Sequence, residues 1–157
     1  MEIRLAQDKD YEQIAELRRE TIRNVNAKDY PQTVIENWAE RRDAQSFKES
    51  AHQCKRWVAV EGETVTGFCE HTFGCEVSRI YVHKNFLRKG IGSQLLAVAE
   101  ASLKEQGCSN IRIVSTVTAK DFYVKNGYKV IQEMFYEDKE DEIVYEMLKE
   151  LSSDSSE

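Results

Sequence analysis

The spacing of apolar side chains along the first quarter of the chain predicts a short strand followed by two helices. Glu2 to Leu5 has strand character, and Asp8 or Asp10 can cap the helix that comes after it. A second helix is expected to begin at Pro31, because proline suits the first helical position, and to reach about Arg42. The positions of the first helix that follow the apolar spacing are Tyr11, Ile14, Leu17, Thr21, Ile22 and Val25.

The middle of the chain changes from strand patterns to a helical pattern. Trp57 to Glu61 and Val65 to Phe73 flank the turn Gly62-Glu63 and predict an antiparallel hairpin. Val77 to Val82 supplies the next strand. Gly90 to Gln106 carries an apolar stripe at helical spacing, and a glycine follows it, which is common just past the end of a helix.

The last third of the chain predicts a strand, a short helix and two further strands. Ile111 to Ser115 is the strand, and Ala119 to Lys125 is the helix. Tyr128 to Phe135 and Ile143 to Leu148 are strands around the acidic segment Glu137–Glu142. Such a segment is usually a solvated hairpin turn; the alternative is that it attracts a polyamine, an aminoglycoside or a lysine side chain.

Taken in order along the chain, these elements define an α/β protein in which one mixed sheet is covered by helices on both faces. No internal repeat or linker divides the sequence, and 157 residues is the size of one compact domain. We therefore expect a single domain over residues 1–150 and a polar tail over residues 151–157.

The composition changes this picture by indicating the kind of partner. Hydrophobic residues make up 41% and charged residues 32%, as in soluble globular proteins, and the formal net charge is -6. An acidic surface repels nucleic acid and anionic membranes, so neither is expected as a partner, whereas a cationic substrate is favoured. No apolar run is long enough for a membrane span or a secretory leader, which predicts a cytoplasmic location.

The cysteines and histidines predict neither a disulfide nor a metal site. The four cysteines form no C-x-x-C pair, and the three histidines have no spacing typical of metal ligands. The cysteines are therefore interpreted as buried or surface thiols. They are Cys54, Cys69, Cys75 and Cys108, and the histidines are His52, His71 and His83.

One segment departs from the acidic character of the chain, between the strand that ends at Val82 and the long helix. Lys84, Arg88 and Lys89 gather positive charge there, and two glycines open the helix. Backbone N–H groups at a helix start lack internal partners and lie at the positive end of the helix dipole, so they bind phosphate where no side chain blocks its approach. The segment therefore predicts an anion-binding loop over residues 87–93.

Spacing excludes two familiar phosphate-binding loops. A dinucleotide fingerprint G-x-G-x-x-G that begins at Gly90 would need glycine in place of Leu95. A P-loop would need its lysine after the last glycine, whereas Lys89 comes before Gly90. The remaining interpretations are a pyrophosphate loop of another type and a purely structural turn.

Two motifs resemble those of the GCN5-related N-acetyltransferase (GNAT) superfamily. Residues 86–96, FLRKGIGSQLL, resemble its coenzyme A motif [RQ]-x-x-G-x-[GA], and residues 119–128, AKDFYVKNGY, resemble its alanine, Phe-Tyr and Gly-Tyr motif. The order of elements resembles the family over nearly the whole chain. Leu87 stands where the family has arginine or glutamine, with Arg88 and Lys89 beside it to compensate.

The resemblance implies a mixed sheet that splays apart after the strand ending at Val82, with acetyl-CoA as co-substrate and no metal. The arm of the coenzyme would lie in the gap, where a rigid strand can hold the thioester and a backbone N–H can stabilise its oxygen. The residues that the resemblance assigns to coenzyme binding are Ile80, Tyr81, Val82, Arg88, Lys89, Gly90, Ile91, Gly92 and Ser93.

An amine acceptor must lose a proton, and the resemblance implies Glu76 as the group that takes it. Glu76 lies fourteen residues before Gly90, where the histone-acetylating branch of the family has its glutamate base. The alternatives are a solvated residue at the strand edge, or Glu70 or His71 as the base. Strand alternation sets Glu76 on one face with Ser78, Ile80 and Val82.

The leaving thiolate must gain a proton, and the resemblance implies Tyr123 as its donor. The alternative is that Tyr123 is an aromatic residue of the core.

The resemblance also places the acceptor pocket near Trp38 and the first two helices. The function expected is acetyl transfer to a primary amine of a small molecule or protein, and the alternative is a non-catalytic acyl-CoA sensor. Members of the family often dimerise, so a homodimer is one expectation and the oligomeric state is left open.

Overall fold

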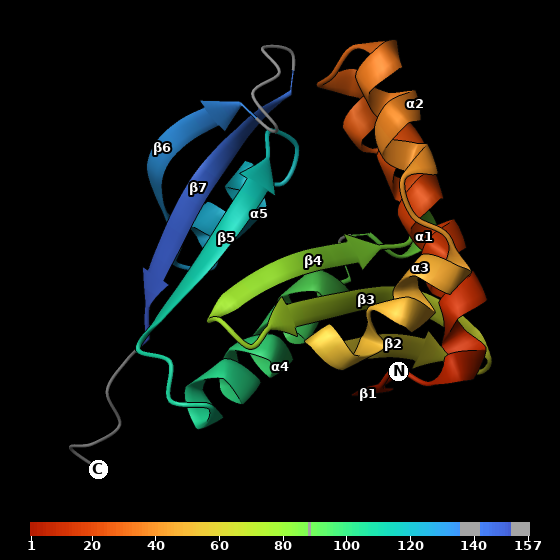
Figure 1. Ribbon diagram of the computed structural model, residues 1–157, viewed down its shortest axis with the longest axis horizontal. Coiled ribbons are helices and arrows are strands. Elements are labelled where there is room, and N and C mark those ends of the chain that lie inside the picture. Colours follow the sequence, from red (N-terminus) through yellow and green to blue (C-terminus); the bar gives the residue numbers. More distant parts are fainter. Residues whose placement is uncertain (88, 136–141, 152–157) are drawn as a thin grey trace.

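The computed structural model describes residues 1–87, 89–135 and 142–151. Among these residues, the central sheet has seven strands in the order β1-β2-β3-β4-β5-β7-β6 (Figure 1). Neighbouring strands are antiparallel except β4 and β5, which are parallel. The strands are β1 (Glu2–Leu5), β2 (Cys54–Glu61), β3 (Thr64–Thr72), β4 (Glu76–Val82), β5 (Asn110–Thr116), β6 (Lys129–Phe135) and β7 (Ile143–Glu150).

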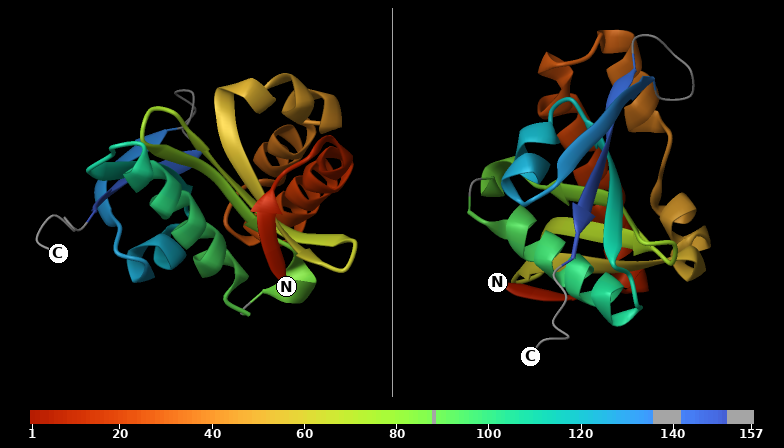
Figure 2. Two further views of the ribbon diagram at one scale, coloured as in Figure 1. Left: turned by 90° about the horizontal axis from the view of Figure 1, so that it is seen from below. Right: turned by 90° about the vertical axis from the view of Figure 1, so that its left-hand side faces the viewer.

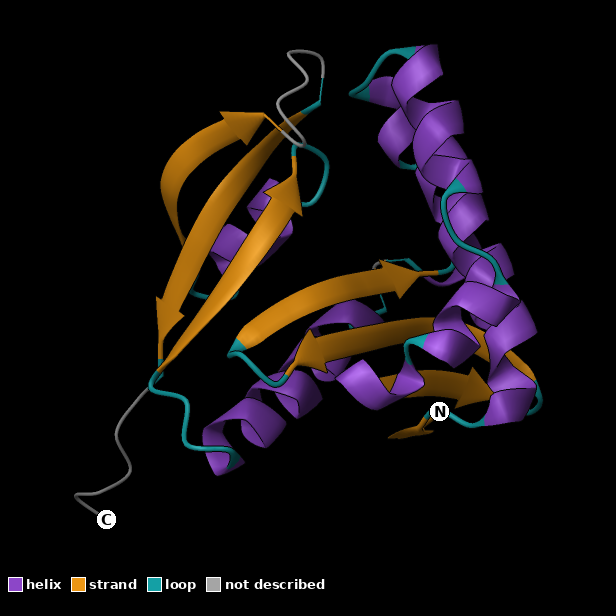
Figure 3. Ribbon diagram, in the orientation of Figure 1, coloured by secondary structure: helices purple, strands orange, loops and turns teal. Residues whose placement is uncertain are grey.

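Helices cover both faces of the sheet, as predicted. Figure 2 shows the N-terminal helices on one face and the later helices on the other, and Figure 3 shows the same layers by secondary structure. Leu95 and Leu103 bury one side of the long helix against the sheet, while Ile14 and Phe47 are buried on the opposite face. The helices are α1 (Tyr11–Asn24), α2 (Gln32–Glu40), α3 (Ala44–Glu49), α4 (Ile91–Glu105) and α5 (Lys120–Lys125).

Two local predictions about helices need correction. The helix α3 was missed, because it has six residues and buries only Phe47, too little for a periodic pattern. Asp43 caps it, and its carboxylate accepts a hydrogen bond from the Ser46 N–H at 2.9 Å. Asp10 does stand before α1, but its carboxylate binds Arg4 at 2.8 Å instead of capping the helix.

The two parallel strands pair at only two positions, Glu76 with Arg112 and Val77 with Ile113. Beyond them, β4 and β5 diverge into the open V that Figure 1 shows. The predicted splay is therefore confirmed, and it begins after Val77 rather than at the end of β4. Residues 79–82 keep their antiparallel partner β3 but have no strand on their other edge among the described residues.

Cys75 and Cys108 form a disulfide, so the expectation of free thiols was wrong for this pair. They are 33 residues apart in sequence, and their Cα atoms are 5.8 Å apart. Cys75 directly precedes β4 and Cys108 closely precedes β5, and these strands begin side by side. The contact depends on the topology of the sheet, which spacing rules for nearby cysteines do not detect. Cys54 and Cys69 are free.

No helix in the described part of the chain is long and apolar enough to cross a membrane. The described residues also contain no group of three or more histidine, cysteine, aspartate or glutamate side chains that could hold a metal ion. Of the predicted polar tail, Leu151 is described, and its N–H donates to the Ser109 carbonyl at 2.8 Å. Residues 152–157 lie outside the described residues.

Candidate functional site

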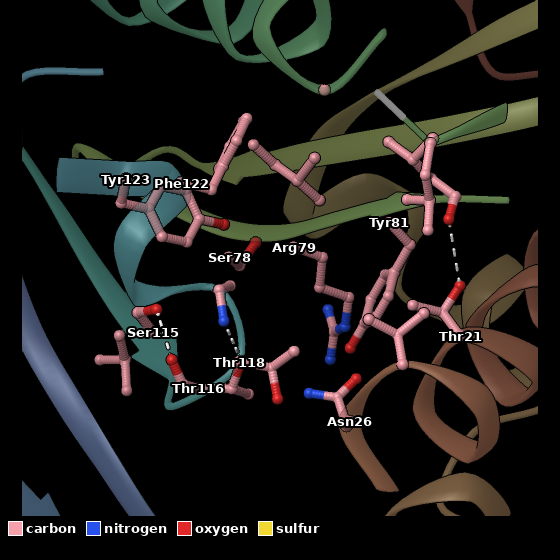
Figure 4. A pocket seen from close by; sticks show the side chains of 17 residues that line it. Thr21, Asn26, Ser78, Arg79, Tyr81, Ser115, Thr116, Thr118, Phe122 and Tyr123 are labelled. Carbon is pink, nitrogen blue, oxygen red and sulfur yellow. Dashed lines mark hydrogen bonds between the residues drawn. The ribbon is translucent and has the colours of Figure 1, made fainter. Parts of the chain in front are cut away.

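A cavity of about 290 Å³ occupies the gap between the diverging strands β4 and β5. Figure 4 shows Phe122 and Tyr123 on one side of it and Thr21 and Asn26 on the other, with Tyr81 between them. The cavity therefore collects residues from the end of α1, both strands and α5. The remaining residues that line it are Val25, Ser78, Arg79, Ile80, Val82, Leu87, Gly92, Val114, Ser115, Thr116, Thr118 and Ala119.

The free edge of β4 forms one wall of this cavity. Ile80, Tyr81 and Val82, which the resemblance assigns to holding the arm of a coenzyme, all line it, and that role stays a prediction. The Val82 carbonyl lies 3.5 Å from the Thr21 hydroxyl, which donates to it. Because β5 has diverged, backbone groups on this edge are available to an extended ligand, which can pair with them as another strand would.

The two glycines at the start of α4 are required for different structural reasons. Gly90 has a φ of 79°, in the left-handed region that glycine tolerates, and it begins the helix without a side-chain cap. Gly92 lines the cavity, and a Cβ atom on it would lie 3.2 Å from the Phe122 ring. The first N–H groups of α4 therefore remain uncapped beside the cavity, an arrangement that suits a phosphate group.

The other residues predicted in the loop contribute differently. The side chain of Ile91 is buried in the hydrophobic core, so only its backbone could contact a ligand. Ser93 and Lys89 are exposed, and the Lys89 ammonium lies 5.5 Å from the Phe86 ring. Of the predicted coenzyme-binding residues, Arg88 lies outside the described residues. Leu87, which departs from the family motif, is 43% exposed and lines the cavity.

Tyr123 is the predicted proton donor, and its side chain is buried in the cavity wall. Its ring contacts Phe122 and Tyr128 at centroid distances of 5.2 and 5.8 Å. Burial raises the pKa of the Tyr123 phenol, so the group is protonated at neutral pH. The hydroxyl makes no hydrogen bond to the described residues. The Tyr123 side chain therefore packs against other aromatic rings and lines the cavity, and its role as proton donor stays a prediction.

A second cavity of about 390 Å³ adjoins the first. The two share Ser78, Arg79 and Tyr81 on β4, together with Val114 and Thr116 on β5. The two cavities thus lie next to each other around the point where the sheet opens. The residues that line only the second cavity are Arg18, Trp38, Arg41, Glu76, Met134, Phe135 and Val144.

Glu76, the predicted base, opens onto the second cavity at the start of β4. Its carboxylate binds the Arg112 guanidinium at 3.1 Å, and its side chain is 30% exposed. Arg112 also binds Glu146, at 2.6 Å. Of the residues predicted on one strand face with Glu76, Ser78 lines both cavities, whereas Ile80 and Val82 line only the first.

The two alternative bases, Glu70 and His71, line neither cavity. Glu70 is buried between Arg56 and Arg79; burial alone would raise its pKa, but the two guanidiniums hold the pKa below its usual value. The His71 ring lies on the other face, 2.8 Å from the Ser102 hydroxyl of α4. Neither group is placed to take a proton from a ligand in these cavities.

Several polar side chains that line the first cavity were not predicted from the sequence. Thr21, Asn26 and Thr118 line the first cavity, and the Thr118 hydroxyl donates to Asp29 at 2.7 Å. A signal was available, because ligands of open α/β sheets bind beyond the carboxyl ends of parallel strands. Thr116 ends the only strand that is parallel to β4 among the described residues, so the residues after it were candidates.

The acidic segment is described only at Glu142, since residues 137–141 lie outside the described residues. Glu142 is 1% exposed, its carboxylate accepts a hydrogen bond from the Trp38 indole, and it lies 3.7 Å from Arg41. This residue is part of the wall behind the second cavity and not of a solvated turn.

The family described as the acetyltransferase (GNAT) domain matches residues 26–149 of the chain. The chain therefore belongs to the GNAT family of acetyltransferases. The resemblance noted in the motifs is confirmed, and so is the fold class. The protein is an N-acetyltransferase that acts with coenzyme A.

Individual relatives agree with this assignment. The chain is 28% identical to spermidine N(1)-acetyltransferase from Thermoplasma acidophilum, over 83% of its own length and 89% of the relative's. PaiA N-acetyltransferase from the same organism, solved with coenzyme A, has a TM-score of 0.77 and 26% identity over 96% of this chain and 98% of that one. A GCN5-related N-acetyltransferase from Rhodopseudomonas palustris shares the fold, with a TM-score of 0.90 and 21% identity over 96% and 95% of the chains.

One further relative matches only locally. The chain is 42% identical over 57 residues to tRNA(Met) cytidine acetyltransferase TmcA from Aeropyrum pernix, covering 34% of this chain and 8% of that protein. The match covers a small fraction of that protein.

Replacing Gly92 with valine is expected to weaken acetyl-CoA binding by at least about tenfold, which corresponds to about 1.4 kcal/mol. The added side chain would meet the Phe122 ring and narrow the cavity beside the helix start. Titration calorimetry with acetyl-CoA measures the effect. Gly74→Val is the matched control, because Gly74 lines neither cavity and a Cβ atom on it would meet only the Thr72 hydroxyl, at an ordinary contact distance of 3.7 Å. Equal affinities for the two variants would contradict the prediction.

Proposed function

We propose that the protein transfers the acetyl group of acetyl-CoA to a primary amine of a small molecule or protein, by direct attack in a ternary complex. The observation that carries this proposal is the pair of adjoining cavities around the divergence of β4 and β5. One adjoins an uncapped helix N-terminus and a free strand edge, and the other contains a carboxylate. Two substrates held in adjoining spaces can react without a covalent intermediate on the enzyme.

In this proposal the coenzyme occupies the first cavity. The N–H groups at the start of α4, from Gly90 to Ser93, bind its phosphates, with Arg88 and Lys89 adding positive charge. The main chain of Ile80 to Val82 holds its arm and orients the acetyl carbonyl. A backbone N–H on this free edge stabilises the negative charge that develops on the carbonyl oxygen during attack.

The reaction moves one proton from the amine and one to the sulfur. The amine nitrogen forms a bond to the carbonyl carbon, the carbon–sulfur bond breaks, and coenzyme A leaves as the thiol. We assign the proton delivered to sulfur to Tyr123, whose buried phenol lines the first cavity. We assign the proton lost by the amine to Glu76, directly or through water, because its carboxylate opens onto the second cavity.

Replacing Glu76 with glutamine is expected to lower kcat/KM about 10 to 100 times and to flatten the acidic limb of its pH profile, as loss of a general base does. Glu146→Gln is the matched control, because Glu146 binds the same arginine, Arg112, but lines neither cavity. Steady-state thiol release against pH measures both variants. If kcat/KM falls equally in both variants, Glu76 acts only through its ion pair with Arg112 and is not the base.

The proposed function is tested by measuring free thiol released from acetyl-CoA with a panel of amines. Amine-dependent release supports acetyl transfer. Tight acetyl-CoA binding without release from any amine would favour a non-catalytic sensor. Absence of both binding and release would overturn the proposal. A homodimer and a cytoplasmic location stay predictions of the sequence.

The relative named for spermidine acetylation makes a polyamine the first acceptor class to include in the panel. Aminoglycosides form a second class, because the fold is shared with an aminoglycoside 6'-acetyltransferase at 19% identity and a TM-score of 0.75. The charged residues that line the second cavity help to decide which class of acceptor amine the protein binds.

A further inference from the structure

The second cavity carries more positive charge than a polyamine acceptor would favour. Among the described residues, three arginines line it, Arg18, Arg41 and Arg79, against the single carboxylate of Glu76. A protonated amine with no negative group would meet net repulsion there, since like charges in a partly buried space are screened weakly. The charge of this cavity therefore differs from the negative net charge of the whole protein.

Three of these four charges are compensated within the protein. Arg41 lies 3.7 Å from Glu142, Arg79 binds the buried Glu70, and Glu76 binds Arg112. Each pair is a cation next to a carboxylate, so these groups have less capacity to attract a further ion.

Arg18 is different, because it has no carboxylate partner among the described residues. Its side chain comes from α1 and is 93% buried, since 7% of the residue is exposed. One terminal nitrogen donates to the Trp38 carbonyl at 2.8 Å, and its buried Nε has no hydrogen-bond partner. A buried guanidinium with an unused donor is costly unless an anion or other acceptor approaches it.

The surroundings of Arg18 increase that cost. Burial lowers the pKa of the Arg18 guanidinium, the Tyr81 hydroxyl opposes this, and the positive charges of Arg79 and Arg42 lower it further. A guanidinium stays protonated in proteins, so the cluster remains positively charged at neutral pH. A negative group in the cavity would relieve both the desolvation and the repulsion.

We propose that the acceptor carries a carboxylate as well as an amine, and that Arg18 binds this carboxylate in the second cavity. The inference rests on the proposed function. The cavity, at about 390 Å³, has the size of a small-molecule site. It shares Ser78 and Tyr81 with the first cavity, so an acceptor anchored at Arg18 would place its amine on the side of the gap. The substrate class is a free amino acid or a similar small carboxylated amine.

The chemistry of arginine suits this role. Its planar guanidinium presents donors in a fork that matches a carboxylate, and hydrogen bonds of this kind to charged groups contribute more than neutral ones. Losing one such contact is expected to lower kcat/KM about 10- to 100-fold, which corresponds to about 1.4 to 2.8 kcal/mol.

The test compares free amino acids with the amines that remain after decarboxylation. Lysine is paired with cadaverine and ornithine with putrescine, and thiol release from acetyl-CoA gives kcat/KM for each member. We expect the carboxylated member of at least one pair to react at least ten times faster. Faster release from the decarboxylated members throughout, or no release from amino acids despite acetyl-CoA binding, would overturn this inference while leaving the proposed function standing. Loss of acetyl-CoA binding as well would overturn both.

Two variants test whether Arg18 causes the preference for carboxylated acceptors. Arg18→Gln should lower the ratio of kcat/KM within a pair by at least tenfold, mainly through KM for the carboxylated member, and Arg18→Lys should keep part of the ratio. Acetyl-CoA affinity, measured by calorimetry, reports whether each variant is folded. Because the readout is a ratio between two acceptors, a general loss of stability would not change it. An unchanged ratio in Arg18→Gln would remove Arg18 from acceptor recognition.

Discussion

Tyr123→Phe is expected to lower kcat about 100-fold while changing acetyl-CoA affinity by less than about twofold, the pattern of a lost proton donor. The substitution removes only the hydroxyl, and the phenyl ring can keep its contacts with Phe122 and Tyr128. The hydroxyl makes no hydrogen bond to described residues, so its removal leaves no buried partner unsatisfied. The expected loss is therefore in the chemical step.

Steady-state thiol release gives kcat, and calorimetry gives the affinity for acetyl-CoA. Tyr128→Phe is the matched control, since Tyr128 is also buried but donates to Glu100 at 2.8 Å and lines neither cavity. This control should cost stability and leave kcat nearly unchanged. If kcat falls by a similar factor in both variants, Tyr123 has a structural role in packing and is not the proton donor.

Glu70→Gln is expected to destabilise the protein by about 3 kcal/mol at neutral pH, within the range for breaking a buried ion pair. The Glu70 side chain is 4% exposed and lies 2.6 Å from the Arg56 guanidinium, while its other oxygen binds Arg79 and accepts from Ser78 at 3.1 Å. The amide would leave two guanidiniums without their shared negative charge. Denaturant unfolding measures the free energy lost.

The pH dependence of this contribution follows from the lowered pKa of Glu70. A carboxylate whose pKa is lower in the folded state stabilises the fold above its unfolded pKa, near 4.3, and loses that contribution as the pH falls through the folded value. The difference between wild type and Glu70→Gln should therefore shrink in acid. Glu16→Gln is the control, because Glu16 forms an exposed pair with Arg19 and should cost about 0.5 kcal/mol or less. Equal costs for the two variants would show that the buried pair is unimportant.

The sequence predicted the elements whose patterns are long and local. The long helix begins after Gly90 and ends before Gly107, which has a φ of 100°, as its glycines indicated. The hairpin around Gly62 and the splay beside Val82 were also predicted, the latter from family resemblance. The motif residues Gly92 and Tyr123 do line one cavity. Their roles in binding and catalysis stay predictions.

The features that were missed depend on contacts between distant segments. Arg18 lies four residues after Ile14 and four before Ile22, on the buried stripe of α1, so its position was a visible irregularity. Its meaning appears only when α2 brings the Trp38 carbonyl to it. The Cys75–Cys108 bond likewise depends on two strands that begin together. Sequence periodicity reports which face is buried, but not which groups meet there.

The brief pairing of β4 with β5 also has a consequence for folding cooperativity. With only two ladder positions between them, backbone hydrogen bonds contribute little to the free energy that couples one half of the sheet to the other. That coupling depends instead on the Cys75–Cys108 crosslink and on the shared core, in which α4 residues such as Leu103 pack with Ile111 and Met147 of the second half. The chain can therefore hold a permanent opening in its sheet and still unfold as one unit.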